Sequence, residues 1–153
     1  MPELSGHKLG DYEVQELLGA GALGRVYRAL QPPFRRPVAL KVLEQGIFTP
    51  HDMVERFRRE AEAMARMEHP HILPIYAAGS VLPYHYIAMR LVRDGTLDDR
   101  LRGVGPDLAT AVSWLRQIVW ALSHAHARGV IHRDIKPSNI LIADGVAFLG
   151  DFG

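Results

Sequence analysis

The sequence predicts an α+β fold, in which an antiparallel sheet comes first and longer helices follow. Two observations carry this prediction. Short runs rich in β-branched and aromatic residues, separated by glycine and proline, dominate the chain up to Leu43. Beyond that point, apolar residues recur at steps of three and four, the spacing of a helix with one buried face. The length of 153 residues corresponds to about one domain, and no internal repeat divides it.

The composition excludes several classes of protein. The chain is 48% hydrophobic and 23% charged, which are ordinary values for a globular domain. It contains no cysteine, so disulfide scaffolds and thiolate metal sites are excluded. A net charge of +1 gives no overall field to attract polyanions, and we expect no nucleic-acid partner. No apolar run is long enough for a membrane segment and no secretory signal is present, so we expect a cytoplasmic location.

The first predicted elements are strands joined by turns. Residues 1–10 are predicted to form a short polar leader, and residues 11–153 the domain. Pro32, Pro33 and Pro37 exclude a helix between the second and third strands and predict a loop. The strands predicted here are Tyr12–Leu18, Arg25–Leu30 and Val38–Leu43.

Helices and further strands alternate in the rest of the chain. A helix is predicted to begin at Thr49, which can cap it, with Pro50 in its first turn, and to run to about Met67. A short helix is predicted over Leu97–Leu101, and a long one from Asp107 to about Arg128, with Gly129 as its stop. The strands predicted after the first helix are Leu73–Ala78, Tyr84–Leu91, Val130–Ile131, Ile140–Ile142 and Val146–Leu149.

Glycines recur between the first two predicted strands. Gly19, Gly21 and Gly24 are followed by Val26 in the pattern G-x-G-x-x-G-x-V. Glycines let backbone N–H groups turn sharply and approach phosphates closely. A dinucleotide-binding turn has a similar pattern, but it needs a helix directly after the glycines. Because Arg25–Leu30 is β-like, we favour a glycine-rich turn between two antiparallel strands.

Lysine is rare in this chain. Of 18 cationic residues, only Lys8, Lys41 and Lys136 are lysines. The ammonium is a compact point charge and arginine a planar fork, so Lys41 and Lys136 are candidates for sites that need an ammonium. Glu60, on the helix after the Lys41 strand, could orient Lys41 toward phosphates. The alternative is that Glu60 is one solvated acid among several on that helix.

The loop from His132 to Asn139 brings together an acid, a cation and a carboxamide. Asp134 can accept a hydroxyl proton, and Lys136 can neutralise charge on a phosphoryl group in transfer. Asn139 and Asp151 offer oxygen ligands of the kind that Mg²⁺ prefers. A loop Asp or Asn is more often a turn residue, but that interpretation weakens when four motifs occur in one order.

These four motifs are the glycine turn, V-A-x-K, H-R-D-x-K-P-x-N and D-F-G, and together they resemble a eukaryotic-type (Hanks-type) serine/threonine protein kinase domain of bacterial kind. The resemblance implies a protein-kinase-like N-lobe, an antiparallel sheet plus one helix, followed by the first, mainly helical part of the C-lobe. It also implies ATP and Mg²⁺ as cofactors and a protein substrate with a Ser or Thr acceptor. Lys136-Pro137 resembles the Ser/Thr-directed branch.

Roles follow from the resemblance by position. Asp134 would be the catalytic base with Lys136 beside it, Asn139 and Asp151 would hold the metal, and Lys41 would bind phosphates. The other cofactor-binding residues that the resemblance implies are Gly19, Ala20, Gly21, Gly24, Val26, Ala39, Glu60, Met89, Arg90, Val92 and Leu141. Among them, Val26, Ala39 and Leu141 would sandwich the adenine ring, Met89 would guard its pocket, and Arg90–Val92 would form the hinge. Met64, Ile75, His132 and Phe152 would stack into an apolar column.

The sequence also departs from the family's pattern. Leu23 stands where many kinases have an aromatic residue at the tip of the glycine loop, and Arg90 where the hinge often has an acid. We expect Leu23 to be tolerated because the loop acts through its backbone, and Arg90 to change nucleotide affinity slightly. The spacing of His69 and His71, and of His124 and His126, resembles that of zinc ligands. We expect no zinc site, because cysteine is absent and each histidine has another explanation, His126 as a packed structural residue.

The chain stops at the D-F-G triplet, and we therefore expect a truncated kinase domain. The long helix should then expose an apolar stripe, and the chain alone should lack useful activity. The first hypothesis is an ATP-dependent protein serine/threonine kinase catalytic domain. The alternative is a non-catalytic nucleotide-binding or interaction module. A small-molecule kinase fits less well, because Arg133 and Phe152-Gly153 follow the protein-kinase pattern.

Overall fold

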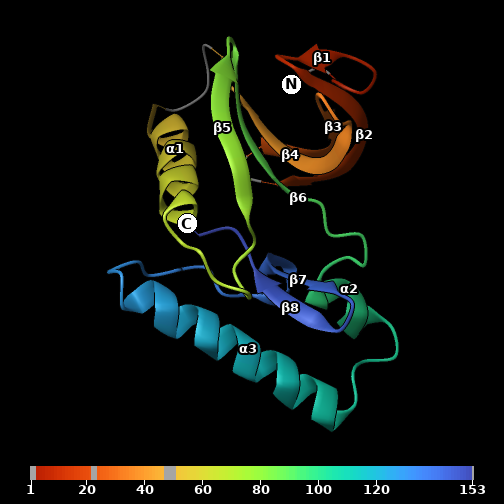
Figure 1. Cartoon of the computed structure of the whole chain (residues 1–153), viewed down its shortest axis with the longest axis vertical. Helices are drawn as coiled ribbons and strands as arrows, with labels where there is room; N and C mark the ends of the chain where they lie inside the picture. The colour runs from red at the N-terminus through yellow and green to blue at the C-terminus, as the bar shows by residue number, and fades with distance from the viewer. Residues whose placement is uncertain (1–2, 22–23, 47–50, 153) are drawn as a thin grey trace. The chain divides into compact units, whose positions relative to one another are not determined.

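The computed structural model describes residues 3–21, 24–46 and 51–152 (Figure 1). The chain forms two compact units, each described here by itself. The first unit contains Met1–Ala61 and Ile75–Leu91, and the second contains Glu62–Pro74 and Val92–Gly153. Leu23, Thr49, Pro50 and Gly153, which the sequence singles out, lie outside the described residues.

The first unit is built on a six-stranded antiparallel sheet with the strand order β1-β2-β3-β4-β6-β5. Neighbours in this sheet are mostly consecutive in sequence, as the predicted alternation of strands and turns requires. Figure 1 shows β2, β3 and β4 as a curved group. The strands are β1 (Lys8–Leu9), β2 (Tyr12–Gly21), β3 (Gly24–Gln31), β4 (Arg36–Glu44), β5 (Ile75–Val81) and β6 (Tyr84–Arg90).

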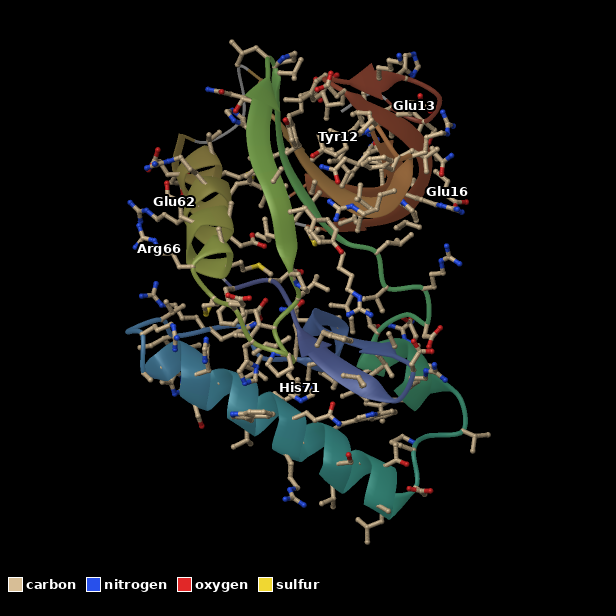
Figure 2. The ribbon with its side chains drawn as sticks, viewed as in Figure 1. Tyr12, Glu13, Glu16, Glu62, Arg66 and His71 are labelled. Atoms are coloured by element: carbon tan, nitrogen blue, oxygen red, sulfur yellow. The ribbon has the colours of Figure 1, made fainter. Side chains whose placement is uncertain are left out.

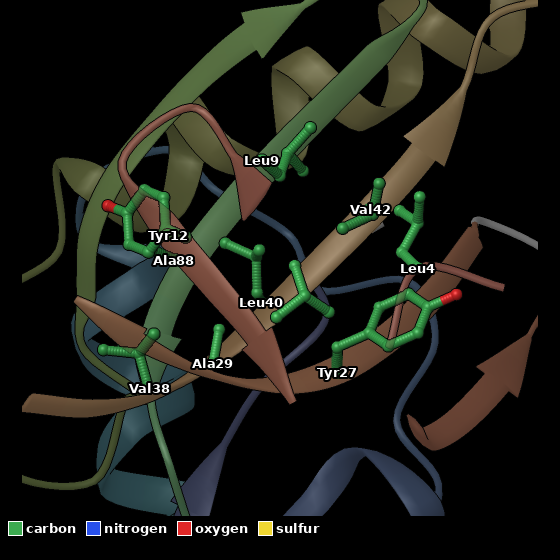
Figure 3. Packing of buried hydrophobic residues seen from close by; sticks show 10 residues of the cluster. Leu4, Leu9, Tyr12, Tyr27, Ala29, Val38, Leu40, Val42 and Ala88 are labelled. Carbon is green, nitrogen blue, oxygen red and sulfur yellow. The ribbon is translucent and has the colours of Figure 1, made fainter. Parts of the chain in front are cut away.

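The core of this unit lies on one face of the sheet. Side chains alternate between faces along a strand, and the face that carries Tyr27, Leu40 and Ala88 is fully buried (Figure 3). Leu4 and Leu9 pack into the same cluster, so the leader that the sequence predicts as polar contributes two core residues. The buried cluster consists of Leu4, Leu9, Tyr12, Val14, Tyr27, Ala29, Val38, Leu40, Val42 and Ala88.

Helix α1 spans His51–Ala65, ending slightly before the predicted Met67. Phe57 and Ala61, one helical turn apart, are both buried, and Glu60 is buried beside them. Pro37 lies inside β4, paired with Leu30, although the sequence predicts it in the loop. Its position near the start of the strand explains why the ladder tolerates a residue without an N–H group.

The second unit contains two α-helices and a hairpin. Helix α2 begins with a capping box in which Thr96 and Asp99 satisfy each other's backbone N–H groups. Helix α3 begins directly after the predicted Asp107, which is its N-cap, because the Asp107 carboxylate accepts a hydrogen bond from the Thr110 N–H at 2.7 Å. The elements are α2 (Leu97–Arg102), α3 (Leu108–His126), the 3₁₀ turn η1 (Pro137–Asn139), β7 (Ile140–Ala143) and β8 (Val146–Leu149).

The predicted strand Val130–Ile131 is wrong. The Val130 N–H bonds back to Ala125 at 3.0 Å, closing the end of α3, and Gly129 has the left-handed φ of +74° that this closure needs. Arg133 then adopts a left-handed φ of +68°. The segment is therefore a helix exit followed by a loop, with no ladder partner among the described residues.

Helix α3 buries one face against the β7–β8 hairpin of its unit and leaves the other open. Trp114 and Ile118 are on the buried face, and the Trp114 indole N–H donates to the Gly145 carbonyl at 3.0 Å. The predicted exposed stripe is present: Leu108, Val112, Leu115, Val119 and Trp120 are all exposed. Across the described residues, no helix has the length and apolar character needed to span a bilayer.

Candidate active site

Strand register gathers several predicted site residues on one face of the first unit's sheet. Val26 pairs with Lys41 across β3 and β4, and Ala39 pairs with Met89 across β4 and β6. Directly paired residues share a face, and so do residues two apart on one strand. Val26, Ala39, Lys41 and Met89 therefore line the face opposite to the core that contains Leu40.

Lys41 and Glu60 form a buried ion pair on that face. The Lys41 Nζ lies 2.7 Å from Glu60 Oε1 and 2.9 Å from Oε2, so one ammonium meets both carboxylate oxygens. The exposed fractions are only 6% for Lys41 and 3% for Glu60. A buried charge requires a partner of this quality. The alternative that Glu60 is a solvated acid of α1 is therefore wrong.

The glycine turn joins the ends of β2 and β3. Gly19 pairs with Val26, Ala20 with Arg25 and Gly21 with Gly24, so the described part of the turn continues the antiparallel ladder. Gly24 has a φ of +105°, and a Cβ there would collide with the Val42 carbonyl. Around Gly19 and Gly21, by contrast, no atom of the described residues lies within 4 Å of the place where a Cβ would stand. The fold itself thus explains Gly24, while open space above the other two glycines leaves room for a ligand.

The predicted hinge begins where β6 ends. Met89 is buried, and Arg90, partly buried, is the last residue of β6 and pairs with Val38. Val92 follows outside any strand, partly buried, and belongs to the second unit.

His132 organises the loop of the second unit that carries the predicted catalytic residues. Its Nε2 lies 2.7 Å from the Gly150 carbonyl, and its Nδ1 accepts the Asp134 N–H at 3.3 Å. These contacts define a neutral ring with its proton on Nε2. Burial lowers the pKa of His132, which favours the same neutral form. The ring also packs on Phe152 with 4.6 Å between centroids, two members of the predicted apolar column.

Asp134, Lys136 and Asn139 are in direct contact. The Lys136 Nζ donates to Asp134 Oδ2 at 2.7 Å, and Asn139 Nδ2 lies 3.1 Å from the same oxygen. Asn139 Nδ2 also donates to the Asp134 carbonyl at 2.8 Å. The Lys136 hydrogen bond holds the pKa of the Asp134 carboxyl below its usual value. Asp134 is thus an exposed, ionised carboxylate held in place by two donors.

Asp151 is tied to the same loop through its neighbour. The Gly150 N–H donates to the Asn139 carbonyl at 3.0 Å, and the Gly150 carbonyl meets His132 as described above. Asp151 itself has a left-handed φ of +52°. Leu141, on β7, comes two residues after Asn139 and forms a bridge with Thr96. The predicted site residues from Asp134 to Asp151 therefore belong to one connected segment of backbone.

Comparison with known proteins decides the family. Residues 12–153 match the family described as the protein kinase domain. The chain belongs to this family. The predicted fold, a kinase-type sheet with one helix followed by part of the helical region, is confirmed by the six-stranded sheet, α1 and the elements of the second unit.

Named relatives of this kinase domain are bacterial serine/threonine-protein kinases. PknE of Mycobacterium bovis is 42% identical over 151 residues, covering 97% of this chain and 26% of the relative. PknJ of Mycobacterium tuberculosis is 40% identical over 157 residues, covering 99% and 27%. PknD of Mycobacterium tuberculosis is 40% identical over 150 residues, covering 97% and 23%. The chain thus spans about a quarter of the length of these relatives.

One residue of this kinase domain was missed from the sequence. Gly150 joins His132, Asn139 and Asp151 through its own backbone groups. A Cβ at this position would lie 3.2 Å from the Leu141 side chain and 3.5 Å from that of Leu73, so a larger residue would crowd the segment. The only signal in the sequence is a glycine directly before the D-F-G triplet.

The histidines are distributed differently from the prediction. His126, expected to be packed, is exposed at the end of α3. His124, which the sequence pairs with His126, is partly buried and contacts His69 instead, with 4.8 Å between ring centroids. Among the described residues, no three His, Asp or Glu side chains are arranged to hold a metal ion.

Proposed function

We propose that this chain is the ATP-binding part of a protein serine/threonine kinase domain, which transfers the γ-phosphoryl group of ATP to a Ser or Thr hydroxyl of a protein. In this reaction the acceptor oxygen forms a bond to the γ-phosphorus as the bond to the β–γ bridging oxygen breaks. ADP leaves, and the hydroxyl proton passes to a base. The residues act mainly by positioning and by charge stabilisation.

The observation that carries the proposal is the buried pair of Lys41 and Glu60. An ammonium held by both oxygens of Glu60, at 2.7 and 2.9 Å, is fixed in direction. It lies on the same face as Val26 and Ala39, where phosphates and adenine are proposed to bind. A structural role alone is weakly supported, because buried ion pairs seldom stabilise a fold more than apolar residues of similar size.

Asp134 is proposed as the base that receives the hydroxyl proton. Its carboxylate is exposed, accepts hydrogen bonds from Lys136 and Asn139, and remains ionised because its pKa is lowered. Lys136, 2.7 Å from Asp134, is proposed to neutralise charge on the transferring group. Both side chains are about half exposed and thus accessible to a substrate.

Asn139 and Asp151 are proposed to hold Mg²⁺. Asn139 makes its two hydrogen bonds through the amide nitrogen, which directs its side-chain oxygen away from Asp134. An amide oxygen and a carboxylate suit this hard cation. Mg²⁺, when bound, would neutralise phosphate charge and orient the phosphates.

Val26, Ala39 and Leu141 are proposed to contact the adenine ring, and Met89 is proposed to guard the adenine pocket. Arg90–Val92 would contact adenine through backbone groups, and Gly19, Ala20, Gly21 and Gly24 would cover the phosphates. The open space around Gly19 and Gly21 supports this last assignment. The family match over residues 12–153 supports a domain of residues 11–153, whereas the packing of Leu4 and Leu9 in the core argues against a separate leader of residues 1–10.

Thermal unfolding with Mg-ATP tests nucleotide binding. At a concentration of about 100 times Kd, ATP should stabilise the chain by about 2.7 kcal/mol. Lys41→Met should remove most of this stabilisation, and Asp151→Asn should remove the part that depends on Mg²⁺. Lys8→Met, a change of the same type at an exposed position of β1, is the matched control and should leave it intact. No stabilisation of the unmodified chain would refute the proposal.

The second candidate function is a nucleotide-binding or interaction module without catalysis. The exposed apolar face of α3 favours it for this chain alone, because that face suits contact with further protein. We propose accordingly that the 153-residue chain binds ATP but transfers little phosphate by itself. Stabilisation by Mg-ATP without phosphorylation of a generic Ser/Thr protein substrate is the expected result. Efficient transfer would contradict this part of the proposal and support the first.

A further inference from the structure

A cluster of three histidines and a tryptophan in the second unit has no part in the proposed function. His69 and His71 belong to the segment after α1, and Trp120 and His124 belong to α3. The His69 ring lies 4.7 Å from the Trp120 ring, edge to face, and 4.8 Å from the His124 ring, between centroids. The His71 ring lies 5.5 Å from Trp120 and reaches β8, where its Nδ1 is 3.1 Å from the Ala147 carbonyl. Figure 2 labels His71 at this position over α3.

Hydrogen bonds require two of these rings to be neutral. His69 Nδ1 accepts the backbone N–H of His71 at 3.1 Å. His124 Nδ1 lies 3.2 Å from Arg128 Nη1, and a guanidinium can only donate. Both Nδ1 atoms are therefore acceptors. A proton added to either one would place two donors face to face and break the bond.

The surroundings oppose a positive charge on the His69 ring. Within the part of the chain that the structure describes, the buried Nε2 atoms of His69 and His124 have no hydrogen-bond partner. The groups that act on His69 are His71 from its own segment and His124 and Arg128 from α3, all of them neutral or cationic. Strand β8 contributes the Ala147 carbonyl, which His71 occupies. Burial, followed by these neighbours, lowers the pKa of His69.

His71 differs from the other two. Its Nδ1–H donates to the Ala147 carbonyl, so its Nε2 can take up a proton without loss of this bond. A charge on His71 would nevertheless repel a charge on His69. A fall in pH therefore weakens the contact between His69 and His124 in two ways. Protonation breaks the hydrogen bonds that the two Nδ1 atoms accept, and the charged rings then repel one another.

We propose that His69 and His124 form an acid-sensitive latch, in which the neutral rings hold the segment 69–71 on α3 and protonation releases it. The segment is also bound to β8, since the Leu149 N–H donates to the His71 carbonyl at 2.8 Å and the Leu73 N–H donates to the Leu149 carbonyl at 2.9 Å. If the segment 69–71 were released from α3, these two backbone hydrogen bonds to β8 would still hold it. The latch follows from its own contacts and does not depend on the proposed function.

The test is a pH titration of the 153-residue chain by ¹H–¹⁵N NMR from about pH 8 to about pH 5. The ring nitrogens of His69 and His124 should show the neutral form with the proton on Nε2 at the start of the titration, and the lowered pKa of His69 should make it titrate below the usual range of histidine. As the rings take up protons, the Trp120 indole signal should shift. Exchange of the His71 amide, corrected for the intrinsic effect of pH, should rise about tenfold. Amides of β4 should keep their protection, which separates release of the latch from global unfolding.

His69→Asn is the informative variant, because the Asn oxygen can accept the same i+2 backbone N–H and has no proton to gain. It should keep the His71 amide protected throughout and abolish most of the Trp120 shift. His126→Asn, an exposed histidine on the same helix, is the matched control and should behave as the unmodified chain. Titration of His69 and His124 without any change at the His71 amide would overturn the latch. So would an unchanged Trp120 shift in His69→Asn, and the ring signals of the unmodified chain decide the matter if that variant fails to fold.

Discussion

Lys41 holds its charge in a place with almost no water, and this is possible only because Glu60 meets it with two oxygens. The strand places Lys41 opposite Val26 and Ile87, and α1 places Glu60 above it. The rarity of lysine in the sequence marks Lys41 as unusual. The sequence analysis names Glu60 as the candidate partner, and the packing of α1 on the sheet decides between that role and a solvated acid.

Replacing one partner of the Lys41–Glu60 pair should destabilise the fold more than replacing both partners. Lys41→Met leaves the Glu60 carboxylate buried without its cation, so we expect the free energy of unfolding to fall by about 3 kcal/mol. The double variant Lys41→Met/Glu60→Leu should recover most of that loss, because no charge stays buried. Urea unfolding of both variants, with Lys8→Met as the control, measures the difference. Equal losses in the single and double variants would show that the buried charge is not the cause.

Lys136 should control the protonation of Asp134. Because the pKa of Asp134 is lowered in the folded chain, its carboxylate stabilises the fold above the ordinary value of 3.8 and loses this effect as the pH falls. Lys136→Met removes the main cause, so the pKa of Asp134 should rise toward its ordinary value and the stabilisation that is lost at low pH should become smaller. Carboxyl ¹³C NMR measures this directly. Asp107, whose pKa is lowered by the Thr110 N–H, is the internal control and should not respond.

At the scale of elements, the glycines of the glycine turn are present for two different reasons. Gly24 is required by the fold, since its φ of +105° and the Val42 carbonyl leave no place for a side chain. Gly19 meets no such restriction within 4 Å. The sequence pattern G-x-G-x-x-G treats the glycines alike, and the difference follows only from the close approach of β3 to β4.

This difference can be measured with two alanine variants. Gly24→Ala should destabilise the chain by more than about 1 kcal/mol, because alanine cannot adopt the local backbone without strain. Gly19→Ala should leave the thermal midpoint almost unchanged but weaken stabilisation by Mg-ATP if this residue covers the phosphates. A large loss of stability in Gly19→Ala would contradict the open space around it, and unimpaired ATP binding would remove it from the proposed site.

Most elements could be predicted because their signals are local. The Asp107 cap and Gly129 fix the ends of α3, and the Asp144-Gly145 turn fixes the β7–β8 hairpin. The error at Val130–Ile131 arose because two β-branched residues look like a strand, while the decisive features are the backbone bond to Ala125 and the positive φ of Arg133. The core role of Leu4 and Leu9 depends on contacts distant in sequence, which no short pattern contains.

For the whole molecule, the exposed face of α3 is the feature whose effect in solution is easiest to measure. A row of apolar side chains that includes Leu115 and Val119 is open to solvent. We expect the chain to bind a hydrophobic dye such as ANS while folded. Leu115→Lys/Val119→Lys should reduce dye fluorescence severalfold without lowering the thermal midpoint. Leu82→Lys, on the loop between β5 and β6, is the control. If the control reduces dye binding equally, the face of α3 is not the binding surface.

The sequence groups the candidate site residues but does not predict their geometry. The motifs place Asp134, Lys136 and Asn139 in one loop, but the hydrogen bonds that converge on the Asp134 carboxylate depend on rotamers that the sequence does not encode locally. The link from His132 through Gly150 to Asp151 is made by backbone groups, which every residue possesses. Chemistry carried by side chains is visible in a sequence, whereas support supplied by the main chain is not.

The alternation of faces along β4 limits how this protein can change in length. Val38, Leu40 and Val42 belong to the core, and Ala39 and Lys41 lie between them on the opposite face. Insertion or deletion of one residue within the strand would exchange the two sets, so that Lys41 would enter the core and leucine would face Glu60. Gains and losses of sequence should therefore be confined to turns such as residues 32–35, where no side chain has an assigned face. The alternation of side chains along β4 therefore restricts changes to the sequence as much as any single residue does.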